Sequence, residues 1–492
     1  MLPYKNLLVI DKNSDRAVFN QIAMQFIHLI QEGKLLPGTA LPSTRTLALD
    51  LGLHRKTIVA AYESLVAGNW VDNLPRKGFI VSPDLPVVRP RSYHDGRIGA
   101  YESGPGFEYE QIGSFPYPSS LSQKGALIID DGFPDITLLP GHVLLKEYRN
   151  ALAPAVLKKL STGWDLEGPS DCRSALCGFL NQTRGIDIKV ENLLTTKGAQ
   201  MAIYIAASLI IKPGDKVIVC DPSYIFANMV FEELGAELIR VPVDSDGMNT
   251  GIVEEILKKH TIRLIYIIPH HHHPTTVTMS VERRNHLLRL IKNYQLAVIE
   301  DDYDYDFQFQ YEPYLPLASG DHEGNIIYIG SLTKVLGAPF RLGYMVAAGK
   351  FIHDAATKRM LINLRGDIFT EQVISNLITG GELTRLIQKA NKVYRQRCHF
   401  LADLLNTELS DVVELTRPNG GMALWLRFNP DLPLTKVLEK ASARGIRIMG
   451  SVYTRGDNAT YNALRFGFAS LNEADLSKAV DILKTSIRQL KY

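Results

Sequence analysis

The stretch NIIYIGSLTKVLGAPFRLGYMVA, residues 325–347, places one lysine between two short apolar segments. Both segments, residues 325–330 and 341–347, have the length and the β-branched and aromatic content of buried strands. Lys334 follows the first strand, among small and hydroxyl residues. Because active residues of α/β proteins gather where parallel strands end, Lys334 is a candidate for a Schiff base with an aldehyde cofactor.

Five more segments of the same kind precede this stretch and are separated by segments with helical character. Seven strands of this kind predict an α/β fold with a mostly parallel sheet. A smaller C-terminal α+β part is expected after it. The five segments are residues 192–196, 216–220, 236–241, 263–269 and 296–301.

Polar residues follow several of these predicted strands. Asp301 ends one strand, and Tyr303 lies two residues further on, so both point to the same side if the chain stays extended. A carboxylate at Asp301 can keep a pyridine nitrogen protonated, which makes the ring an electron sink. After another strand, Tyr224 in DPSY can lie flat on an aromatic ring.

A phosphate site is expected where the strand 192–196 meets the next helix. Free backbone N–H groups at a helix N-terminus suit an anion. Together with the lysine, the aspartate and the aromatic side chain, this site specifies pyridoxal 5′-phosphate (PLP) as cofactor. The residues expected around the phosphate are Gly198, Ala199, Gln200, Ser331, Thr333 and Arg341.

Each of these residues also has a plain structural interpretation. Lys334 and Arg341 can be surface cations, and the acidic residues from Asp301 onward can form a solvated loop. A calcium loop of the EF-hand type is excluded, because counting Asp302 as its first position puts Phe307 at the glycine and a proline at the final glutamate. The ordered set at successive strand ends favours the cofactor site.

The first 82 residues carry nine Lys and Arg against six Asp and Glu, which indicates nucleic acid as a partner of this end. Apolar residues at helical spacing predict one helix up to Gly33, and two short helices end at Gly52 and Gly68. Two short strands follow, joined by a basic loop. This order predicts a winged helix-turn-helix, with the third helix in a major groove. The residues expected at DNA are Ser43, Arg45, His54, Arg55, Lys56, Thr57, Arg76, Lys77 and Gly78.

The segment LIQEGKLLPGTALPSTRTLALDLGLHRKTIVAAYESLVAGNWV resembles the winged helix of the GntR family of bacterial regulators. The resemblance covers the whole segment, including its G-x-L-x-P-G-x-x-L-P-S-x-R pattern, and implies DNA binding. His54 stands where the family often has Ser or Thr, which affects the expected operator sequence and not the activity.

The rest of the chain shows how the parts are arranged. Residues 83–130, rich in Pro, Gly, Ser and Tyr and without sustained periodicity, are interpreted as a linker. We expect domains at residues 1–82, 131–385 and 386–492. Four cysteines without CxxC spacing, no signal-peptide core and no apolar run long enough for a bilayer predict a cytoplasmic protein.

From about residue 130 onward, the chain resembles fold type I aminotransferases through GFPDITLLP, TTKGAQ, DPSY, IEDDYDYDF, YIGSLTKVLGAPFRLGY and LRFGFASL, in the family's order. The resemblance implies that Lys334 is the Schiff-base lysine, Asp301 the pyridinium partner and Tyr303 a donor to the ring oxygen. It also implies that Arg341 binds phosphate and that Arg465 pairs with a ligand carboxylate. The combination with a GntR-like winged helix is similar to MocR/GabR regulators, whose head-to-tail dimers imply a homodimer here.

The stretch PHHHHPTT, residues 269–276, resembles the family turn that replaces the enzymes' NPTG. His273 occupies the position of the asparagine that contacts the ring oxygen, and His271 matches a histidine common in these regulators. A metal site is not expected, because neighbouring side chains in an extended run diverge and no Cys or spaced His completes a tetrahedron.

Two departures from the family pattern stand out. The stretch TGWDLEGPSDCRSAL has no tyrosine where the regulators have one that reaches the phosphate of the neighbouring subunit, which predicts weaker phosphate binding. Thr276 replaces the glycine of PTG, which narrows the backbone options of the turn.

The leading hypothesis is a PLP-dependent transcription regulator that senses an amino compound by external aldimine formation at Lys334. Arg465 favours an effector with a carboxylate, such as an amino acid. The alternative is an active aminotransferase with a fused DNA-binding domain, because every residue needed for the first half-reaction is present. A DNA-binding scaffold without cofactor predicts loss of Lys334 or Asp301, and both are present.

Overall fold

The structure is a computed structural model that describes residues 4–11, 14–75, 78–85, 105–109, 126–309, 314–449, 453 and 461–491. The chain forms two compact units, Met1–Ser114 and Phe115–Tyr492, and each is described by itself. Within these described ranges, no helix combines the length and the apolarity needed to cross a membrane.

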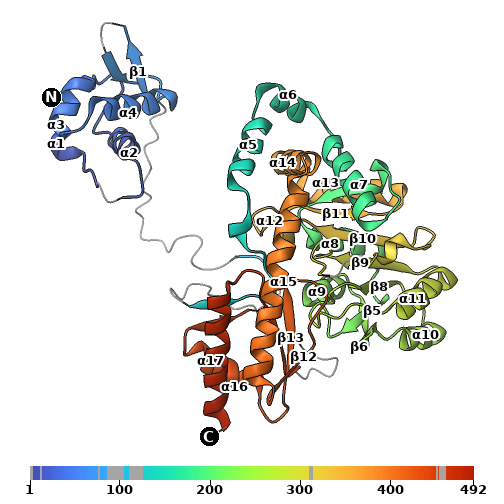
Figure 1. Ribbon diagram of the computed structural model, residues 1–492. Helices are drawn as coiled ribbons and strands as arrows, with labels where there is room; N and C mark the ends of the chain where they lie inside the picture. Colours follow the sequence, from blue (N-terminus) through green and yellow to red (C-terminus); the bar gives the residue numbers. More distant parts are fainter. Residues whose placement is uncertain are drawn as a thin grey trace. The chain divides into compact units, whose positions relative to one another are not determined.

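The first unit is a helical bundle with a two-stranded wing (Figure 1). Ser43 is the N-cap of the helix Thr44–Leu51, because its hydroxyl accepts from the Thr46 N–H at 3.1 Å. Gly52 ends the same helix with a φ of 65°. These ends confirm the helix expected there. The elements are α1 (Tyr4–Leu7), α2 (Val18–Gln31), α3 (Thr44–Leu51), α4 (Arg55–Ala67), β1 (Val71–Leu74) and β2 (Gly78–Val81).

Aromatic and aliphatic side chains from all three long helices fill the core of this unit. Phe26 of α2 and Tyr62 of α4 are fully buried and meet edge to face, with ring centroids 5.8 Å apart. The Tyr62 hydroxyl donates to the Pro42 carbonyl at 2.9 Å, which fixes the start of α3 relative to α4. The predicted wing residues Arg76 and Lys77 lie outside the described residues.

An eight-stranded sheet forms the centre of the second unit, in the order β4-β11-β10-β9-β8-β5-β6-β7. All seven predicted strands are present, and the eighth, β7, is a two-residue strand at the edge. Strands β6, β5, β8, β9 and β10 are parallel, whereas β11 runs antiparallel between β10 and β4. The bounds are β4 (Leu193–Thr196), β5 (Lys216–Asp221), β6 (Glu237–Asp244), β7 (Gly247–Met248), β8 (Leu264–Ile267), β9 (Ala297–Asp302), β10 (Ile326–Ser331) and β11 (Gly343–Val346).

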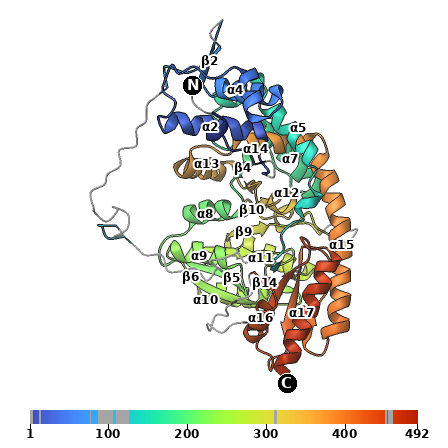
Figure 2. The same cartoon turned by 90° about the vertical axis from the view of Figure 1, so that its left-hand side faces the viewer.

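Helices cover both faces of this sheet (Figure 2). Alternation along β5 shows why: Val217 and Val219 belong to one core, and Ile218 and Cys220 to the other. The first face packs against α8 (Ala199–Ile210), α9 (Ile225–Glu233) and α13 (Gly349–Asn363). The other face packs against α7 (Ser170–Arg184), α10 (Thr250–Lys259), α11 (Val281–Tyr294) and α14 (Ile368–Thr379), with α5 (Gly141–Ala151) and α6 (Pro154–Thr162) beyond.

The C-terminal part is a smaller α+β layer, as the sequence predicts. Strands β12 (Val413–Leu415), β13 (Ala423–Phe428) and β15 (Ala463–Gly467) are antiparallel, and α16 (Leu434–Ser442) and α17 (Glu473–Lys491) belong to the same part. The long helix α15 (Glu382–Leu409) joins the two parts and contains the expected boundary at residue 385 (Figure 1).

One strand of the C-terminal part comes from the stretch interpreted as a linker. β3 (Leu127–Ile129) pairs in parallel with β14 (Ile446–Ile448), so residues more than 300 positions apart lie side by side. The folded part of the second unit therefore begins before residue 130. This pairing places residues 130–135 at the junction between the large sheet and the C-terminal part.

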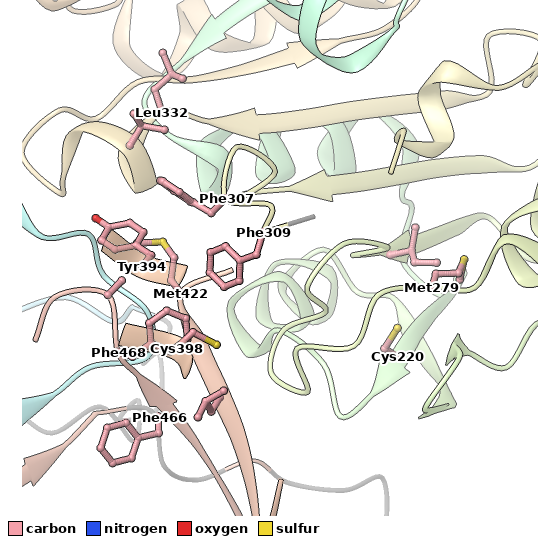
Figure 3. Packing of buried hydrophobic residues seen from close by; sticks show 14 of the residues in the cluster. Cys220, Met279, Phe307, Phe309, Leu332, Tyr394, Cys398, Met422, Phe466 and Phe468 are labelled. Carbon is pink, nitrogen blue, oxygen red and sulfur yellow. The ribbon is translucent and has the colours of Figure 1, made fainter. Parts of the chain in front are cut away.

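Apolar side chains close this junction. Figure 3 shows Phe307 and Phe309, from the loop after β9, beside Tyr394 and Met422. The rings of Phe307 and Tyr394 lie 5.2 Å apart, and the Phe307 carbonyl accepts from the Gly421 N–H at 2.7 Å. The loop that carries Asp301 is thus held from both sides.

Arg184 also holds this loop, through a buried ion pair with Asp306 at 2.7 Å. The side chains are 1% and 8% exposed, and Arg184 Cζ lies 4.4 Å from the Tyr305 ring centroid. We expect Arg184→Met to lower the free energy of unfolding by about 3–5 kcal/mol, because it leaves a buried carboxylate uncompensated. Urea unfolding of the full chain measures this loss. The double variant Arg184→Met/Asp306→Leu should be clearly more stable than the single variant, and equal losses would contradict the charge argument.

Candidate functional site

Lys334 lies in α12 (Thr333–Leu336), directly after β10. Its Nζ donates to the Gly132 carbonyl at 2.7 Å and lies 5.0 Å from the Phe133 ring centroid. Burial lowers the pKa of Lys334 from its ordinary value. The charge of Arg465 lowers this pKa further, whereas nearby carboxylates such as Asp131 raise it. A lysine with a lowered pKa supplies more of the neutral amine, which is the nucleophilic form.

Asp301 is the last residue but one of β9, in the middle of the sheet. Its Oδ2 accepts from the Tyr266 hydroxyl at 2.7 Å, whereas its Oδ1 is buried without a hydrogen-bond partner in the described part of the chain. Burial raises the pKa of Asp301 to about 7, although the Tyr266 hydrogen bond works in the opposite direction. A buried carboxylate with one open oxygen is suited to a cationic N–H group.

The expected phosphate turn is formed by three neighbouring strands. Ser331 of β10 is opposite Gly343 of β11, which is opposite Thr196 of β4. Gly198, with a φ of 87°, precedes α8, and no side chain caps the N-terminus of that helix. A Cβ on Gly343 would lie 2.5 Å from the Gly198 carbonyl carbon, so only glycine allows this approach.

Side chains around this turn supply the expected donors. Arg341 is exposed, and its Nη2 donates to the Lys197 carbonyl at 3.4 Å. The Ser331 hydroxyl accepts from the Thr333 N–H at 3.1 Å, which shapes the start of α12. Gln200 donates to the Phe226 carbonyl at 3.0 Å and keeps a buried Oε1 without a protein partner among the described residues.

His273 and Tyr224 form the aromatic side of the site, with ring centroids 5.2 Å apart. His273 Nε2 shares a hydrogen bond with Asp131 Oδ2 at 3.1 Å, and its buried Nδ1 has no partner within the described ranges. Burial lowers the pKa of His273, so the ring is mainly neutral near pH 7. One nitrogen of His273 is therefore available to a ligand.

The other three histidines of PHHHHPTT turn to separate protein partners. His270 lies 3.4 Å from Asp302, His271 3.0 Å from Asp304, and His272 2.8 Å from the Thr275 hydroxyl. No cluster of three or more His, Cys, Asp or Glu suited to a metal occurs in the described ranges. Of the two predicted cofactor contacts, His273 therefore faces the site, and His271 packs against the C-terminal part, where a Cβ on Gly420 would lie 2.3 Å from its Nε2.

The turn after these histidines adopts a conformation that favours glycine. Thr276 has a φ of 63°, in the left-handed region, and its N–H donates to the His272 carbonyl at 2.6 Å. The threonine thus keeps the backbone that a glycine would adopt.

The segment that lacks the family's tyrosine exposes Trp164, and Arg365 Cζ lies 5.5 Å from the centroid of the Trp164 ring.

Arg465 of β15 is 1% exposed and joins three loops. Its Nε donates to the Asp131 carbonyl at 2.9 Å, its Nη1 to the Pro274 carbonyl at 3.1 Å and its Nη2 to the Tyr303 hydroxyl at 2.9 Å. The Tyr303 hydroxyl in turn donates to the His271 carbonyl at 2.9 Å. The resemblance implies that Tyr303 donates to the ring oxygen of the cofactor. To do so, its hydroxyl would have to give up the hydrogen bond to the His271 carbonyl.

Two residues of the site escaped the sequence interpretation. Tyr266 lies inside an apolar strand and looked like core, although it holds Asp301. Asp131 precedes the GFPD motif, and only the chain fold brings it to His273. An adjacent acidic pair, Asp130 and Asp131, before an apolar turn was the available signal.

Comparison with known proteins identifies the family. Residues 140–483 match the family described as aminotransferase class I and II. The chain belongs to this family. A solved archaeal alanine:glyoxylate aminotransferase is 27% identical, with a TM-score of 0.69 over 74% of this chain and 91% of that one. Kynurenine aminotransferase of Pyrococcus horikoshii shares the fold, with a TM-score of 0.69, 24% identity and coverage of 75% and 92%.

Residues 19–81 match the gntR family of bacterial regulatory proteins. The MocR-type resemblance is confirmed: this is a GntR-type DNA-binding regulator fused to an aminotransferase-like domain. The uncharacterized HTH-type transcriptional regulator YdfD of Bacillus subtilis is 26% identical over 95% of this chain and 96% of its own length. The pyridoxine biosynthesis regulator PdxR of Corynebacterium glutamicum is 25% identical over 96% and 98%.

Aminotransferases of this fold depend on PLP, and the site fits this cofactor. Asp301 Oδ1 and His273 Nδ1 are buried polar atoms without protein partners in the described structure, and both suit polar atoms of a pyridine ring. The uncapped N-terminus of α8 beside Arg341 suits a phosphate. Lys334 supplies the amine. These residues would hold the ring, the phosphate and the aldehyde end.

Most of the described residues that the sequence predicts at DNA are exposed on the first unit. His54, Arg55 and Lys56 are exposed at the start of α4, where the His54 Nδ1 accepts from the Lys56 N–H at 3.2 Å. Arg55 also donates to the Thr44 hydroxyl at 3.3 Å, which connects α4 with α3. Arg45 of α3 and Gly78 of the wing are exposed, whereas Ser43 serves as an N-cap and Thr57 is half-buried.

The raised pKa of Asp301 predicts that the free energy of unfolding of the cofactor-free protein depends on pH. This carboxyl titrates near pH 3.9 in unfolded chains, and its folded pKa is about 7. The folded state therefore binds the proton more tightly, so stability falls as the pH rises from about 4 to about 7. Above pH 7, Asp301→Asn should raise the free energy of unfolding by an amount on the order of a few kcal/mol. Near pH 4, the same replacement should change this free energy little.

Urea unfolding of cofactor-free wild type and Asp301→Asn at a series of pH values measures this difference. Asp187→Asn, which changes an exposed carboxylate of the same unit, is the control. A constant difference between Asp301→Asn and wild type at all pH values would contradict the assignment of a buried, proton-holding carboxyl.

Proposed function

We propose that this protein is a transcription regulator that senses a small amino compound at Lys334 and passes the signal to its winged helix. The observation that carries the proposal is the pairing of a DNA-binding unit with an amine whose pKa is lowered by burial. An intracellular, cytoplasmic location follows from DNA as the partner.

The residues around Lys334 can exchange one amine for another. PLP supplies an aldehyde carbon that reacts with amines and a ring that withdraws electrons. The neutral Nζ of Lys334 can take the proton of an incoming ammonium group, which makes the effector nucleophilic. The Gly132 carbonyl, which accepts from Nζ at 2.7 Å, would stabilise the protonated amine.

The other site residues hold the ring during this exchange. Asp301 accepts a proton or a cationic N–H at its open Oδ1, and His273 offers its free Nδ1. The uncapped α8 N-terminus and Arg341 would hold the phosphate end of the cofactor. An effector can shift the regulator only if it binds two arrangements with different affinity.

A homodimer is part of the proposal. Leu361 and Leu364 at the end of α13 are 75% and 65% exposed, and Trp164, 66% exposed, lies against the neighbouring Arg365, so three large apolar side chains gather on one part of the surface. Their burial in a dimer would hold two winged helices together, and two half-sites on DNA would then be read at a fixed spacing.

Transamination is the second candidate function. It is favoured by Lys334, whose lowered pKa suits a general base as well as a sensor. The cofactor spectrum separates the two: an amine donor that converts bound PLP to pyridoxamine phosphate, with recovery on adding a keto acid, identifies an aminotransferase.

Lys334→Ala tests the sensing proposal. We expect DNA affinity without effector to remain, because the winged helix is unchanged, and every effector-dependent change in DNA affinity to disappear. The measurement is a DNA-binding titration with a panel of amines and amino acids. Lys350→Ala, which changes a lysine of α13, is the matched control and should respond as wild type does.

A normal effector response in Lys334→Ala would rule out Lys334 as the sensing amine. Loss of DNA binding in this variant without effector would instead show that Lys334 serves folding.

Arg55 and Arg45 test the DNA interface. Each replacement by Ala should weaken binding to a duplex and reduce the slope of log affinity against log salt by about 1, because one phosphate contact is lost. Titration at several salt concentrations gives both quantities. Lys158→Ala, at an exposed lysine of the second unit, should leave the affinity and the slope unchanged. An unaltered slope in both arginine variants would place the DNA elsewhere.

A further inference from the structure

Asp131 sets which nitrogen of the neutral His273 ring carries the proton. Asp131 follows β3, and its Oδ2 lies 3.1 Å from His273 Nε2. Burial favours the neutral carboxyl of Asp131, but the hydrogen bond with His273 and the charge of Arg465 help to hold its pKa below the ordinary value. An ionised carboxylate can only accept hydrogen bonds, so the proton of neutral His273 is on Nε2. The Nδ1 atom therefore has a lone pair and no proton.

The turn that carries Asp131 is held by its own hydrogen bonds. Asp130 Oδ1 accepts from the Gly132 N–H at 2.8 Å, which shapes the turn. The Asp131 carbonyl accepts from Arg465 Nε at 2.9 Å, which fixes the backbone at this position. The Asp131 side chain takes no part in these bonds and contacts His273.

The Nδ1 lone pair of His273 is enclosed by aromatic side chains. The His273 residue is 8% exposed. Its ring centroid lies 5.2 Å from that of Tyr224, 6.2 Å from that of Tyr303 and 5.9 Å from that of Tyr453. Within the ranges that the structure describes, Nδ1 has no hydrogen-bond partner. A buried acceptor without a partner is costly, so this atom points to a bound ligand.

The cofactor that fits this site leaves one polar group for His273. Lys334 would take the aldehyde end, Asp301 the ring nitrogen, and the N-terminus of α8 the phosphate. The remaining polar group of the cofactor is its ring hydroxyl. These three assignments leave that hydroxyl for His273.

Tyr303 is engaged elsewhere and does not supply a proton to this hydroxyl oxygen. Its own hydroxyl donates to the His271 carbonyl at 2.9 Å and accepts from Arg465 Nη2 at 2.9 Å. A ring hydroxyl next to a protonated ring nitrogen is acidic, and its ionised oxygen only accepts hydrogen bonds. Two acceptors, this oxygen and His273 Nδ1, cannot form a hydrogen bond unless a proton is added between them.

We infer that Asp131 and His273 form a proton-carrying pair: when the ring hydroxyl oxygen of the cofactor binds, His273 takes up one proton at Nδ1 and donates it to that oxygen. The proton comes from solvent, and no other bond forms or breaks. His273 becomes an imidazolium that donates from Nε2 to Asp131 and from Nδ1 to the ring oxygen. The inference rests on the proposed function, because it concerns the cofactor of the Lys334 site.

The charges around His273 act in both directions. Burial opposes a second proton on the ring, as do Arg465 of β15 and Lys334 of α12, whereas Asp131 favours it. The adjacent imidazole of His272 is neutral, because burial lowers its pKa to about 3. The ionised ring oxygen would add a second negative charge beside Nδ1. Protonation of His273 is therefore expected with the cofactor bound and not before.

The test is a calorimetric titration of the full-length, cofactor-free protein with pyridoxine 5′-phosphate. This compound has the ring nitrogen, the ring hydroxyl and the phosphate of the cofactor but no aldehyde, so it forms no bond to Lys334. Titrations in buffers with different ionisation enthalpies give the number of protons taken up on binding. About pH 8 is suitable, because Asp301, with a pKa of about 7, is then mostly ionised before the ligand binds.

Two asparagine variants should lose the proton uptake. We expect wild type to take up about one proton more than His273→Asn, because an amide N–H donates without a proton from solvent. Asp131→Asn should lose the same proton, because the new amide can donate to Nε2 and leave the neutral ring with its proton on Nδ1. Asp131→Glu should retain the wild-type count. Asp187→Asn, at an exposed carboxylate of the same unit, is the control.

The proton count separates this role from a structural one. A replacement that only disturbs packing lowers the affinity for pyridoxine 5′-phosphate and leaves the count unchanged. In wild type, log affinity should also fall with rising pH more steeply than in the two asparagine variants, by about one per pH unit. The two variants act on opposite sides of the pair, so one of them with a wild-type melting temperature is sufficient for the comparison.

A wild-type proton count in a folded asparagine variant would overturn the inference, while the proposed function would stand. Absence of pyridoxine 5′-phosphate binding by wild type would overturn both, because the site would then not hold the cofactor. A count lower by about one in the variants supports the pair, and the effector titration of Lys334→Ala decides separately on sensing.

Discussion

The buried guanidinium of Arg465 holds the candidate site together. Its three hydrogen bonds reach residues that follow β3, β8 and β9, and it projects from β15 of the C-terminal part. A buried cation requires compensation, because its transfer from water is costly unless polar groups surround it. Backbone carbonyls and the Tyr303 hydroxyl supply this compensation. As a result the turn at Asp131, the histidine turn and the Tyr303 loop are fixed relative to one another.

The parallel sheet supplies the second constraint. Strands β5, β8, β9 and β10 end at the same edge, so Tyr224, His273, Asp301 and Lys334 meet although up to 110 positions separate them in the chain. Strand β11 starts at this edge and runs antiparallel away from it, so Gly343 lies against the start of α8. Helix α15 and the contact between Phe307 and Tyr394 then join this edge to the C-terminal part.

Burial and neighbouring charges shift the pKa values of the titratable groups in the site. Burial lowers the pKa of Lys334 and His273 and raises that of Asp301, so amine, imidazole and carboxyl all move toward their neutral forms. Asp131 behaves differently, because its hydrogen bond with His273 and the charge of Arg465 help to lower its pKa. In the proposed regulator, the groups that would take part in amine exchange are therefore close to their neutral forms.

The sequence alone determined the two kinds of domain, the seven strands, both caps of α3 and the glycine that ends α4. It also showed that Lys334, Asp301 and Gly198 stand at strand ends, because each of these features depends on local spacing. The tertiary structure decided what depends on distant pairing. β3 joins the C-terminal part through β14, which carries Asp131 to His273, and Tyr266 reaches Asp301 from the neighbouring strand. Four adjacent histidines look alike in a sequence, yet folding gives each a different partner. Partner choice across strands depends on register and burial, which no local pattern contains.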